Sequence, residues 1–172
     1  MKIITICRLA KEKKISELIN IVKELGDNYS LDIIGDGPDF RKLDNFIKKS
    51  GIENKVKLLG YKQNSKIKNI LKKYDIYINN SDFEGFPNTV IEALSVGIPV
   101  LASQSFGGIN EILKDVSFGY IYHNRVELKK YLQLIKNKEI KFNFTRKKLY
   151  SHLNKFNENL NLKKYEKIFS EI

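Results

Sequence analysis

Apolar positions along the chain alternate between short continuous runs and longer amphipathic stretches. The short runs are typical of buried strands, and we expect six of them, at residues 2–7, 30–34, 55–59, 75–79, 99–102 and 118–122. The stretches between them carry apolar residues at helical spacing, as at 15–25, 39–49 and 65–73. Strands that alternate with single helices need crossover connections, which give a parallel sheet covered on both faces. The pattern therefore predicts a doubly wound α/β domain.

The stretch at 81–113 contains a glycine–proline turn followed by a short amphipathic helix. Pro87 suits the first position of that helix, because the N–H that proline lacks would have no partner there. The first amides of a helix likewise lack intrahelical partners. We therefore predict that the amides of Asn88, Thr89 and Val90 face outward beside Gly85 and form an anion site.

Two carboxylates flank this predicted anion site. Glu84 comes just before the helix, and Glu92 lies in its second turn. Both would repel a phosphate unless they face other groups, and hydroxyls fit that role. A ligand with a negative centre and hydroxyl-rich ends is a nucleotide-sugar, which is the ligand that the pattern predicts. The alternative for Glu84 is a carboxylate that only complements the helix dipole.

The residues E-G-F-P-N-T-V-I-E-A-L-S-V-G-I-P-V, followed by G-G-I-N-E-I, resemble the signature of the retaining glycosyltransferases of family 4, or group 1, which have the GT-B fold. That signature has two glutamates separated by seven residues, as Glu84 and Glu92 are. The resemblance implies that Glu92 holds the ribose hydroxyls and that Glu84 contacts hydroxyls of the transferred sugar. It also implies backbone contacts to the sugar and the diphosphate from Phe86, Pro87, Asn88 and Thr89.

The loop after the first strand, C-R-L-A-K-E-K-K, resembles the family's Gly-Arg-Leu…Glu-Lys-Gly segment. The resemblance assigns Arg8 and Lys13 to the diphosphate. Two fixed cations suit a departing diphosphate, because its negative charge grows in the transition state. Cys7 and Lys14 depart from the pattern, since the family has glycine at both positions. We expect Cys7 to pack as a buried thiol, while Lys14 leaves the geometry of the loop open.

Ligands of a doubly wound sheet bind beyond the carboxyl ends of its strands, so we expect the turns after the first four strands to share one cleft. The turn G-D-G-P at 35–38 matches the family's Gly-x-Gly-Pro turn and would bring Gly37 near the base. By itself it is only a tight turn, because it lacks the full dinucleotide fingerprint. Tyr61 lies in the segment whose main chain reads the base in relatives, and a plain surface aromatic is an equal alternative. Glu111 is expected to complement a helix dipole.

The 172 residues suffice for one domain, which we divide into an α/β core at 1–122 and a helical segment at 123–172. The segment at 160–172 resembles the family's closing amphipathic helix. The resemblance covers only the donor-binding half of a two-domain enzyme, so we expect the N-terminal acceptor domain to be absent from this chain. The earlier part of the helical segment has an apolar face of Leu128, Tyr131, Leu132 and Ile135.

Lys, Ile and Asn are abundant throughout the chain, so the net charge of +11 indicates compositional drift as much as function. Part of the excess charge suits anionic nucleotides or an anionic membrane surface. No recognition motif for nucleic acid accompanies it, so nucleic acid is not an expected partner. The sequence shows no membrane-spanning run and no signal peptide, and its single cysteine fits a reducing compartment. We expect a cytoplasmic location, with peripheral contact at the inner face of the membrane left open. Cys7, His123 and His152 offer no zinc-ligand cluster, and both histidines are expected at the surface.

The sequence thus predicts the nucleotide-sugar-binding domain of a retaining glycosyltransferase that moves a hexose or an N-acetylhexosamine to a glycan or lipid-linked acceptor. Such enzymes generally need no metal, so no cofactor is expected, and Arg8, Lys13 and the helix start would replace a cation. The alternative is a non-catalytic nucleotide-binding module that needs a partner domain or subunit. The setting implied by the resemblance is bacterial surface polysaccharide or lipid-linked glycan assembly.

Overall fold

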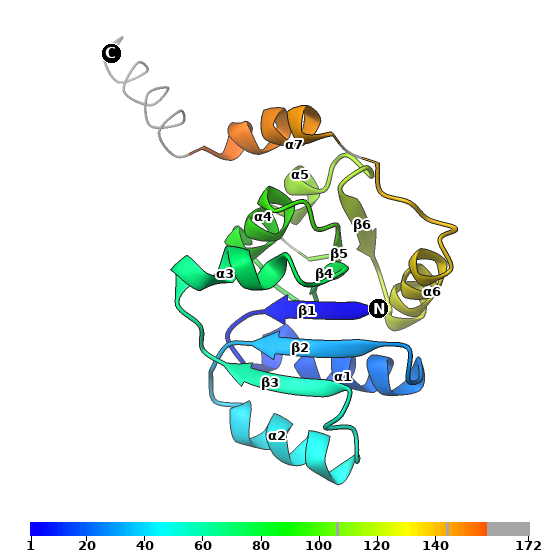
Figure 1. Ribbon diagram of the computed structural model, residues 1–172. Coiled ribbons are helices and arrows are strands. Elements are labelled where there is room, and N and C mark those ends of the chain that lie inside the picture. The colour runs from blue at the N-terminus through cyan, green and yellow to red at the C-terminus, as the bar shows by residue number, and fades with distance from the viewer. Residues whose placement is uncertain (106, 144, 158–172) are drawn as a thin grey trace.

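The computed structural model describes residues 1–105, 107–143 and 145–157. Within them six strands form one sheet in the order β3-β2-β1-β4-β5-β6, and every pair of neighbours is parallel (Figure 1). The predicted doubly wound parallel sheet is therefore confirmed. The strands are β1 (Lys2–Ile6), β2 (Ser30–Ile34), β3 (Val56–Gly60), β4 (Ile76–Asn79), β5 (Val100–Ser103) and β6 (Gly119–Tyr122).

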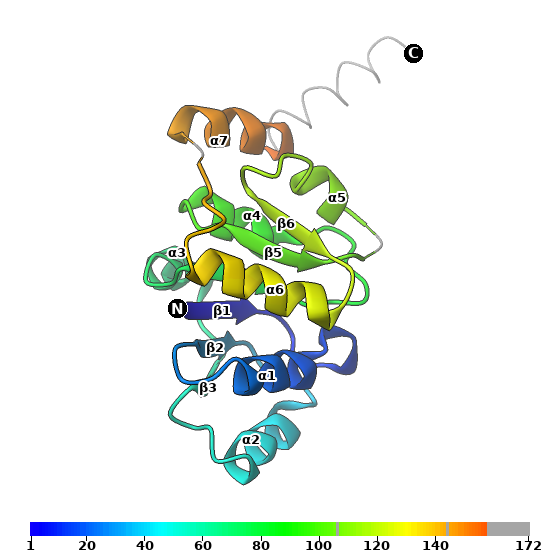
Figure 2. The same ribbon diagram turned by 90° about the vertical axis from the view of Figure 1, so that its right-hand side faces the viewer.

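Helices cover both faces of this sheet, with α1 and α6 in front of the strands in Figure 2. One face is covered by α1 (Ile15–Glu24), α2 (Phe40–Lys49) and α6 (Arg125–Lys136). The other is covered by α3 (Asn64–Leu71), α4 (Asn88–Ser95), α5 (Ile109–Ile112) and α7 (Arg146–Leu153). Two 3-10 turns, η1 (Lys11–Lys13) and η2 (Asn154–Phe156), complete the elements of the described residues.

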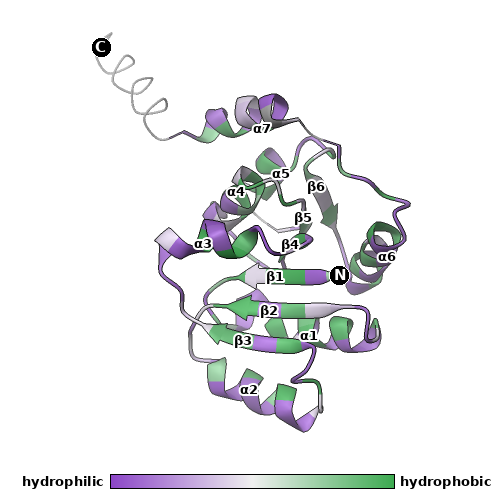
Figure 3. Ribbon diagram, viewed as in Figure 1, coloured by the Kyte–Doolittle hydropathy of each residue, from purple (hydrophilic) through white to green (hydrophobic). Residues whose placement is uncertain are grey.

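Side chains of successive strand residues point to opposite faces of the sheet and so enter two separate cores. Ile3 and Ile33 pack with α1, α2 and α6, whereas Ile4 and Ile34 pack with the helices of the other face. None of the four is more than 2% exposed. In Figure 3 hydrophobic residues are accordingly concentrated in the strands, while a helix such as α2 carries both kinds of residue.

The predicted strands and helices agree with the observed ones to within two residues at each end. One detail at the start of α4 is wrong. Pro87 is the N-cap residue rather than the first helical residue, and its ψ of 82° lies outside the helical range. The reason is a tight turn just before the helix, in which the Asn88 amide donates to the Phe86 carbonyl at 3.0 Å.

The two helices after β6 pack against the sheet from opposite sides. The predicted apolar face of α6 is confirmed, because Leu128 and Leu132 are fully buried in the same core as β1. Leu149 of α7 is 7% exposed and joins the other core. The helix predicted at 160–172 lies outside the described residues. Among the described residues, no helix has both the length and the apolar character to cross a membrane.

His152 on α7 corrects the expectation that both histidines lie at the surface. His123 is exposed as expected, but His152 is half-buried, and its Nε2 lies 2.7 Å from the carbonyl oxygen of Ile112. Its ring also packs against the ring of Phe118, with 4.6 Å between centroids. His152 therefore helps to hold α7 against the end of α5.

Candidate functional site

The order of the strands reverses between β1 and β4, and the loops that leave these two strands meet there. The Asp82 amide of the second loop donates to the Glu12 carbonyl of the first at 2.9 Å. The side chain of Asp82 also forms an ion pair with that of Lys14. Ligands of doubly wound sheets bind at such a reversal of strand order. The two joined loops therefore form the base of the candidate site.

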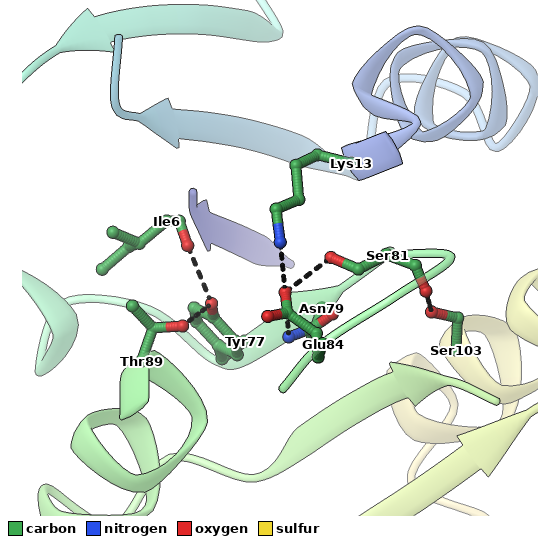
Figure 4. A network of polar contacts seen from close by, with 8 residues as sticks. All are labelled: Ile6, Lys13, Tyr77, Asn79, Ser81, Glu84, Thr89 and Ser103. Carbon is green, nitrogen blue, oxygen red and sulfur yellow. Dashed lines mark hydrogen bonds and ion pairs between the residues drawn. The ribbon is translucent and has the colours of Figure 1, made fainter. Parts of the chain in front are cut away.

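Lys13 and Glu84 are the centre of this site. The Lys13 ammonium lies 2.6 Å from Glu84 Oε1, and the two side chains are only 15% and 17% exposed. Ser81 Oγ donates to the same oxygen at 2.7 Å, and Asn79 Nδ2 lies 3.4 Å from it. Figure 4 shows the three donors converging on Oε1. The predicted diphosphate cation and the predicted sugar carboxylate are thus in direct contact, which the sequence did not indicate.

This contact bears on the alternative role of Glu84 as a carboxylate that complements the helix dipole. The helix begins only at Asn88, and its N-terminus has no side-chain cap. Glu84 instead bonds to side chains from the loops after β1 and β4 and from the end of β4 itself. The geometry therefore favours a role for Glu84 inside the site.

A second group of hydrogen bonds ties the start of α4 to β1 and β4. The hydroxyl of Tyr77 lies 2.8 Å from Thr89 Oγ1 and 3.1 Å from the Ile6 carbonyl oxygen. Tyr77 is 1% exposed, and burial raises the pKa of its phenol well above the ordinary value. The Thr89 hydroxyl thus points toward the core, so a ligand beside Thr89 would meet its backbone.

The loop after β1 has a left-handed residue where the resembling family has glycine. Lys14 has φ 46° and ψ 37°, a conformation that glycine adopts at little cost and other residues avoid. The Lys14 carbonyl accepts from Asn80 Nδ2 at 3.0 Å, and Asn80 Oδ1 accepts from the Tyr122 hydroxyl at 2.5 Å. The loop at Lys14, whose geometry the sequence left open, therefore has the conformation of a glycine turn. The side chains of Asn80 and Tyr122 hold this turn in place.

The loop after β5 contacts and supports the loop after β4, which carries Glu84 and is called the Glu84 loop below. Gly107 has φ +115°, and a Cβ on it would lie 1.6 Å from the Glu84 carbonyl oxygen. The Gly108 amide donates to the Gly85 carbonyl at 3.0 Å. The sequence indicated the glycine pair only as part of the family signature, and this support was not predicted. Its signal was the pair itself, because adjacent glycines permit the close approach of two backbones.

Two further glycines of the predicted site have different surroundings. Gly37 has φ +156°, and a Cβ there would lie 2.5 Å from the Leu9 carbonyl oxygen, so Gly37 supports the loop that carries Arg8. A Cβ on Gly85 would have no protein atom within 4 Å. Gly85 therefore presents an open backbone at the site. The contact predicted between Gly37 and a nucleotide stays a prediction.

The remaining residues of the first three loops differ in exposure. Arg8 is exposed, and within the part of the chain that the structure describes its side chain makes no hydrogen bond or ion pair. Cys7 is partly buried, and burial raises the pKa of its thiol to about 12, in keeping with the predicted packing role. Tyr61 follows β3 and is 70% exposed, so both roles considered for it stay open.

The apolar side chains between Gly85 and Glu92 differ in their exposure to solvent. Pro87 and Val90 are buried, whereas Phe86 is 45% exposed and its ring lies 5.6 Å from that of Phe156. The amides of Asn88 and Val90 donate to the carbonyls of Phe86 and Pro87, each at 3.0 Å. Two of the three amides that we predicted to face an anion are thus used within the turn.

Glu92 lies in the second turn of α4 and is not a member of the hydrogen-bond network around Glu84. Its carboxylate makes no hydrogen bond within the described residues. Burial raises the pKa of Glu92 above its ordinary value, and the charge of Lys68 on α3 partly offsets this effect. Across the described ranges, no group of three or more His, Cys, Asp or Glu side chains could hold a metal ion. Glu111 lies in the first turn of α5, where its charge was expected.

One protein family and several known proteins are similar to this chain in sequence. The model of the family described as glycosyl transferases group 1 matches residues 1–158. The chain is 32% identical over 122 residues to the GtfA subunit of the UDP-N-acetylglucosamine–peptide N-acetylglucosaminyltransferase of Streptococcus agalactiae, covering 69% of this chain and 24% of that protein. It is also 32% identical over 117 residues to the lipopolysaccharide 1,6-galactosyltransferase of Salmonella typhimurium, covering 64% and 32%.

Solved structures show the same arrangement of the fold. The apo form of the lipopolysaccharide outer core galactosyltransferase WaaB matches 99% of this chain with a TM-score of 0.83 and 25% identity. The pneumococcal O-GlcNAc transferase GtfA, in complex with UDP and GlcNAc, matches 99% with a TM-score of 0.78 and 26% identity. This chain covers 49% of the first structure and 35% of the second. It therefore spans 24% to 49% of the length of these relatives and structures.

Proposed function

Because this chain belongs to the glycosyl transferases group 1, we propose that it is the donor-binding domain of an enzyme that takes a sugar from a nucleoside diphosphate sugar and transfers it with retention of anomeric configuration. The observation that carries the proposal is the Lys13–Glu84 pair at the reversal of strand order between β1 and β4. That pair brings a cation for the diphosphate and an acceptor for sugar hydroxyls to one point.

The proposed roles of the residues follow from their positions. Arg8, Lys13 and the Thr89 amide at the start of α4, which the turn does not use, hold the diphosphate and stabilise the charge that grows on it as the sugar departs. Glu84 accepts hydroxyls of the transferred sugar, and Glu92 accepts the ribose hydroxyls. The two cations serve in place of a metal ion, so the reaction needs no metal cofactor.

The names of the relatives favour a hexose or an N-acetylhexosamine as the sugar, because they include both a galactosyltransferase and an N-acetylglucosaminyltransferase. The acceptor, a glycan or a lipid-linked glycan, would bind to a second domain outside this chain. We place the reaction in the cytoplasm, with peripheral contact to the inner face of the membrane through basic residues.

A non-catalytic nucleotide-binding module is the second candidate. It is favoured by one observation, the limited share of each relative that the chain covers. Such a module would bind the nucleotide and would depend on a partner domain or subunit for transfer. Nucleotide binding by the isolated chain is expected of both candidates, and efficient transfer by the isolated chain is expected of neither.

Calorimetry with UDP and with GDP on the full 172-residue chain tests the binding function. We expect weak binding to one of them that is lost as salt is raised, because most contacts are to an exposed diphosphate. Arg8→Gln should weaken it about tenfold, since a charge-assisted hydrogen bond contributes about 1.5–3 kcal/mol.

The matched control is Arg41→Gln, which removes an exposed arginine of α2, and this variant should bind like the parent chain. Absence of heat with both nucleotides would contradict the proposal. Efficient sugar transfer by the isolated chain would contradict the view that it is only the donor-binding part of the enzyme.

A further inference from the structure

The ammonium of Lys13 already has an anionic partner in the structure. It lies 2.6 Å from Glu84 Oε1, and both side chains are more than four-fifths shielded from solvent. Shielded pairs are screened less by salt than exposed pairs. A diphosphate that recruits Lys13 must therefore draw the ammonium away from a carboxylate to which it is well bound.

One ammonium could in principle bridge Glu84 and a diphosphate, but that geometry brings two anions to within a few ångströms of each other, which raises the free energy of both charged forms. A lysine has a flexible stem and can move its charge instead. The backbone of Lys13 is fixed, because its amide donates to the Ala10 carbonyl at 3.0 Å. Movement of the side chain alone is therefore the simplest way for Lys13 to reach a diphosphate.

Glu84 keeps its place without Lys13, because two neutral donors remain on Oε1. Ser81 and Asn79 are only 3% and 5% exposed, and the Ser81 carbonyl is itself fixed by the Ser103 hydroxyl at 2.6 Å. Among the residues drawn in Figure 4, the second oxygen, Oε2, has no hydrogen bond or ion pair. A carboxylate held in this way can accept a hydroxyl when the ammonium leaves.

We infer that Glu84 competes with the diphosphate for Lys13, and that a sugar hydroxyl replaces the ammonium on Glu84 when a nucleotide-sugar binds. This inference rests on the proposed function and deepens it. A nucleoside diphosphate without its sugar draws Lys13 away from Glu84 and supplies no hydroxyl to replace it. The exchange therefore lowers the affinity for the nucleoside diphosphate relative to the affinity for the nucleotide-sugar. This difference favours release of the nucleoside diphosphate after transfer.

The exchange changes what a Glu84→Gln variant should do. If Glu84 contacted only the sugar, the variant would bind a bare diphosphate as the parent does. With the exchange, the variant should bind UDP more tightly, because Lys13 no longer has a charged competitor. If Glu84 instead orients Lys13 toward the diphosphate, the variant should bind UDP more weakly.

A double-mutant cycle on the full chain isolates the exchange from simple repulsion between Glu84 and the diphosphate. UDP affinity is measured by calorimetry for the parent, Glu84→Gln, Lys13→Met and the double variant, or with GDP if that is the nucleotide bound. Direct repulsion contributes equally with and without Lys13, whereas the exchange requires it. We expect the factor by which Glu84→Gln raises UDP affinity to be about fivefold to tenfold larger in the presence of Lys13 than in the Lys13→Met background. This coupling is within the usual range for coupled sites.

Lys14→Met is the matched control, because Lys14 is the next residue and pairs with Asp82 rather than with Glu84. In its presence Glu84→Gln should act as it does in the parent. Melting temperatures identify any variant that fails to fold, and Lys13→Gln then replaces Lys13→Met. Equal effects of Glu84→Gln in both backgrounds, or weaker binding by Glu84→Gln, would overturn the exchange alone. Failure of the parent to bind either nucleotide would overturn the proposed function and the exchange together.

Discussion

Glu84 and Glu92 carry the same charge and are separated by only seven residues, yet the fold gives them opposite surroundings. Glu84 lies in a loop, and three side chains from β4 and two loops converge on one of its oxygens. Glu92 lies on a regular helix, and its carboxylate bonds to none of the described residues. Helix geometry alone presents Glu92, whereas the position of Glu84 depends on the nearby Asn79 and Ser81 and also on Lys13, which is 71 positions away in the sequence.

Substitutions near Glu84 and at Glu92 should therefore have different effects. A change that displaces the loop backbone should disturb Glu84 and leave α4 in place. A change to the Glu92 side chain should affect one set of ligand contacts and leave the fold as it is. The following predictions test this difference, beginning with the largest expected effect.

Gly107→Ala should have the largest effect, because the added Cβ would lie 1.6 Å from the Glu84 carbonyl oxygen at a position with φ +115°. The left-handed conformation costs a non-glycine residue about 1–2 kcal/mol, and overpacking typically costs about 1–3 kcal/mol more. We expect a loss of roughly 3 kcal/mol in the free energy of unfolding, measured by denaturant titration, together with weaker nucleotide binding.

Gly26→Ala is the matched control for this variant. Gly26 has φ +84°, and a Cβ there would have no atom within 4 Å, so only the conformational cost applies. It should lower the free energy of unfolding by about 1–2 kcal/mol without changing nucleotide affinity. If the two variants lose equal stability, the contact between the β5 loop and the Glu84 loop is not a structural support.

Glu92→Gln should weaken nucleotide binding about tenfold, because an amide replaces a carboxylate whose hydrogen bonds to hydroxyls contribute about 1.5–3 kcal/mol each. The melting temperature at neutral pH should not fall. Burial raises the pKa of Glu92 above its ordinary value, so its ionised form is disfavoured by the fold. The matched control is Glu111→Gln, the same change in the first turn of α5, which should leave affinity unaltered.

The pH dependence of binding gives a second measurement on the same residue. A raised pKa means that Glu92 takes up its proton at a higher pH than an ordinary glutamate with a pKa of 4.5. Nucleotide affinity of the parent should therefore fall on acidification before pH 4.5 is reached. A step of equal size in Glu92→Gln would assign it to another group and would contradict the ribose role.

The features that could be predicted from the sequence are those that depend on local patterns, as the position of Glu92 does, rather than on the tertiary fold, as the position of Glu84 does. The strands and helices were predictable, because apolar periodicity is a local signal, and Glu92 was placed correctly in the second turn of α4. The anion site was predicted from free helix amides, and the turn at Phe86 that uses the Asn88 amide left no comparable signal. The Lys13–Glu84 contact could not be predicted, because it joins residues 71 positions apart and depends on the strand order.

Lys14→Gly should have the smallest effect and tests the other loop of the site. Lys14 is left-handed at φ 46°, where glycine avoids a cost of about 1–2 kcal/mol. Two losses oppose this gain: the greater freedom of glycine in the unfolded chain, about 0.5–1 kcal/mol, and the exposed pair with Asp82, about 0–1 kcal/mol. We expect a net gain of a few tenths of a kcal/mol and a melting temperature about 1 °C higher. Lys14→Gln removes only the ion pair and keeps the conformational cost, so it should melt at or slightly below the temperature of the parent. If Lys14→Gly melts below Lys14→Gln, the loop does not hold Lys14 in the left-handed conformation, and the correspondence with the family's glycine is lost.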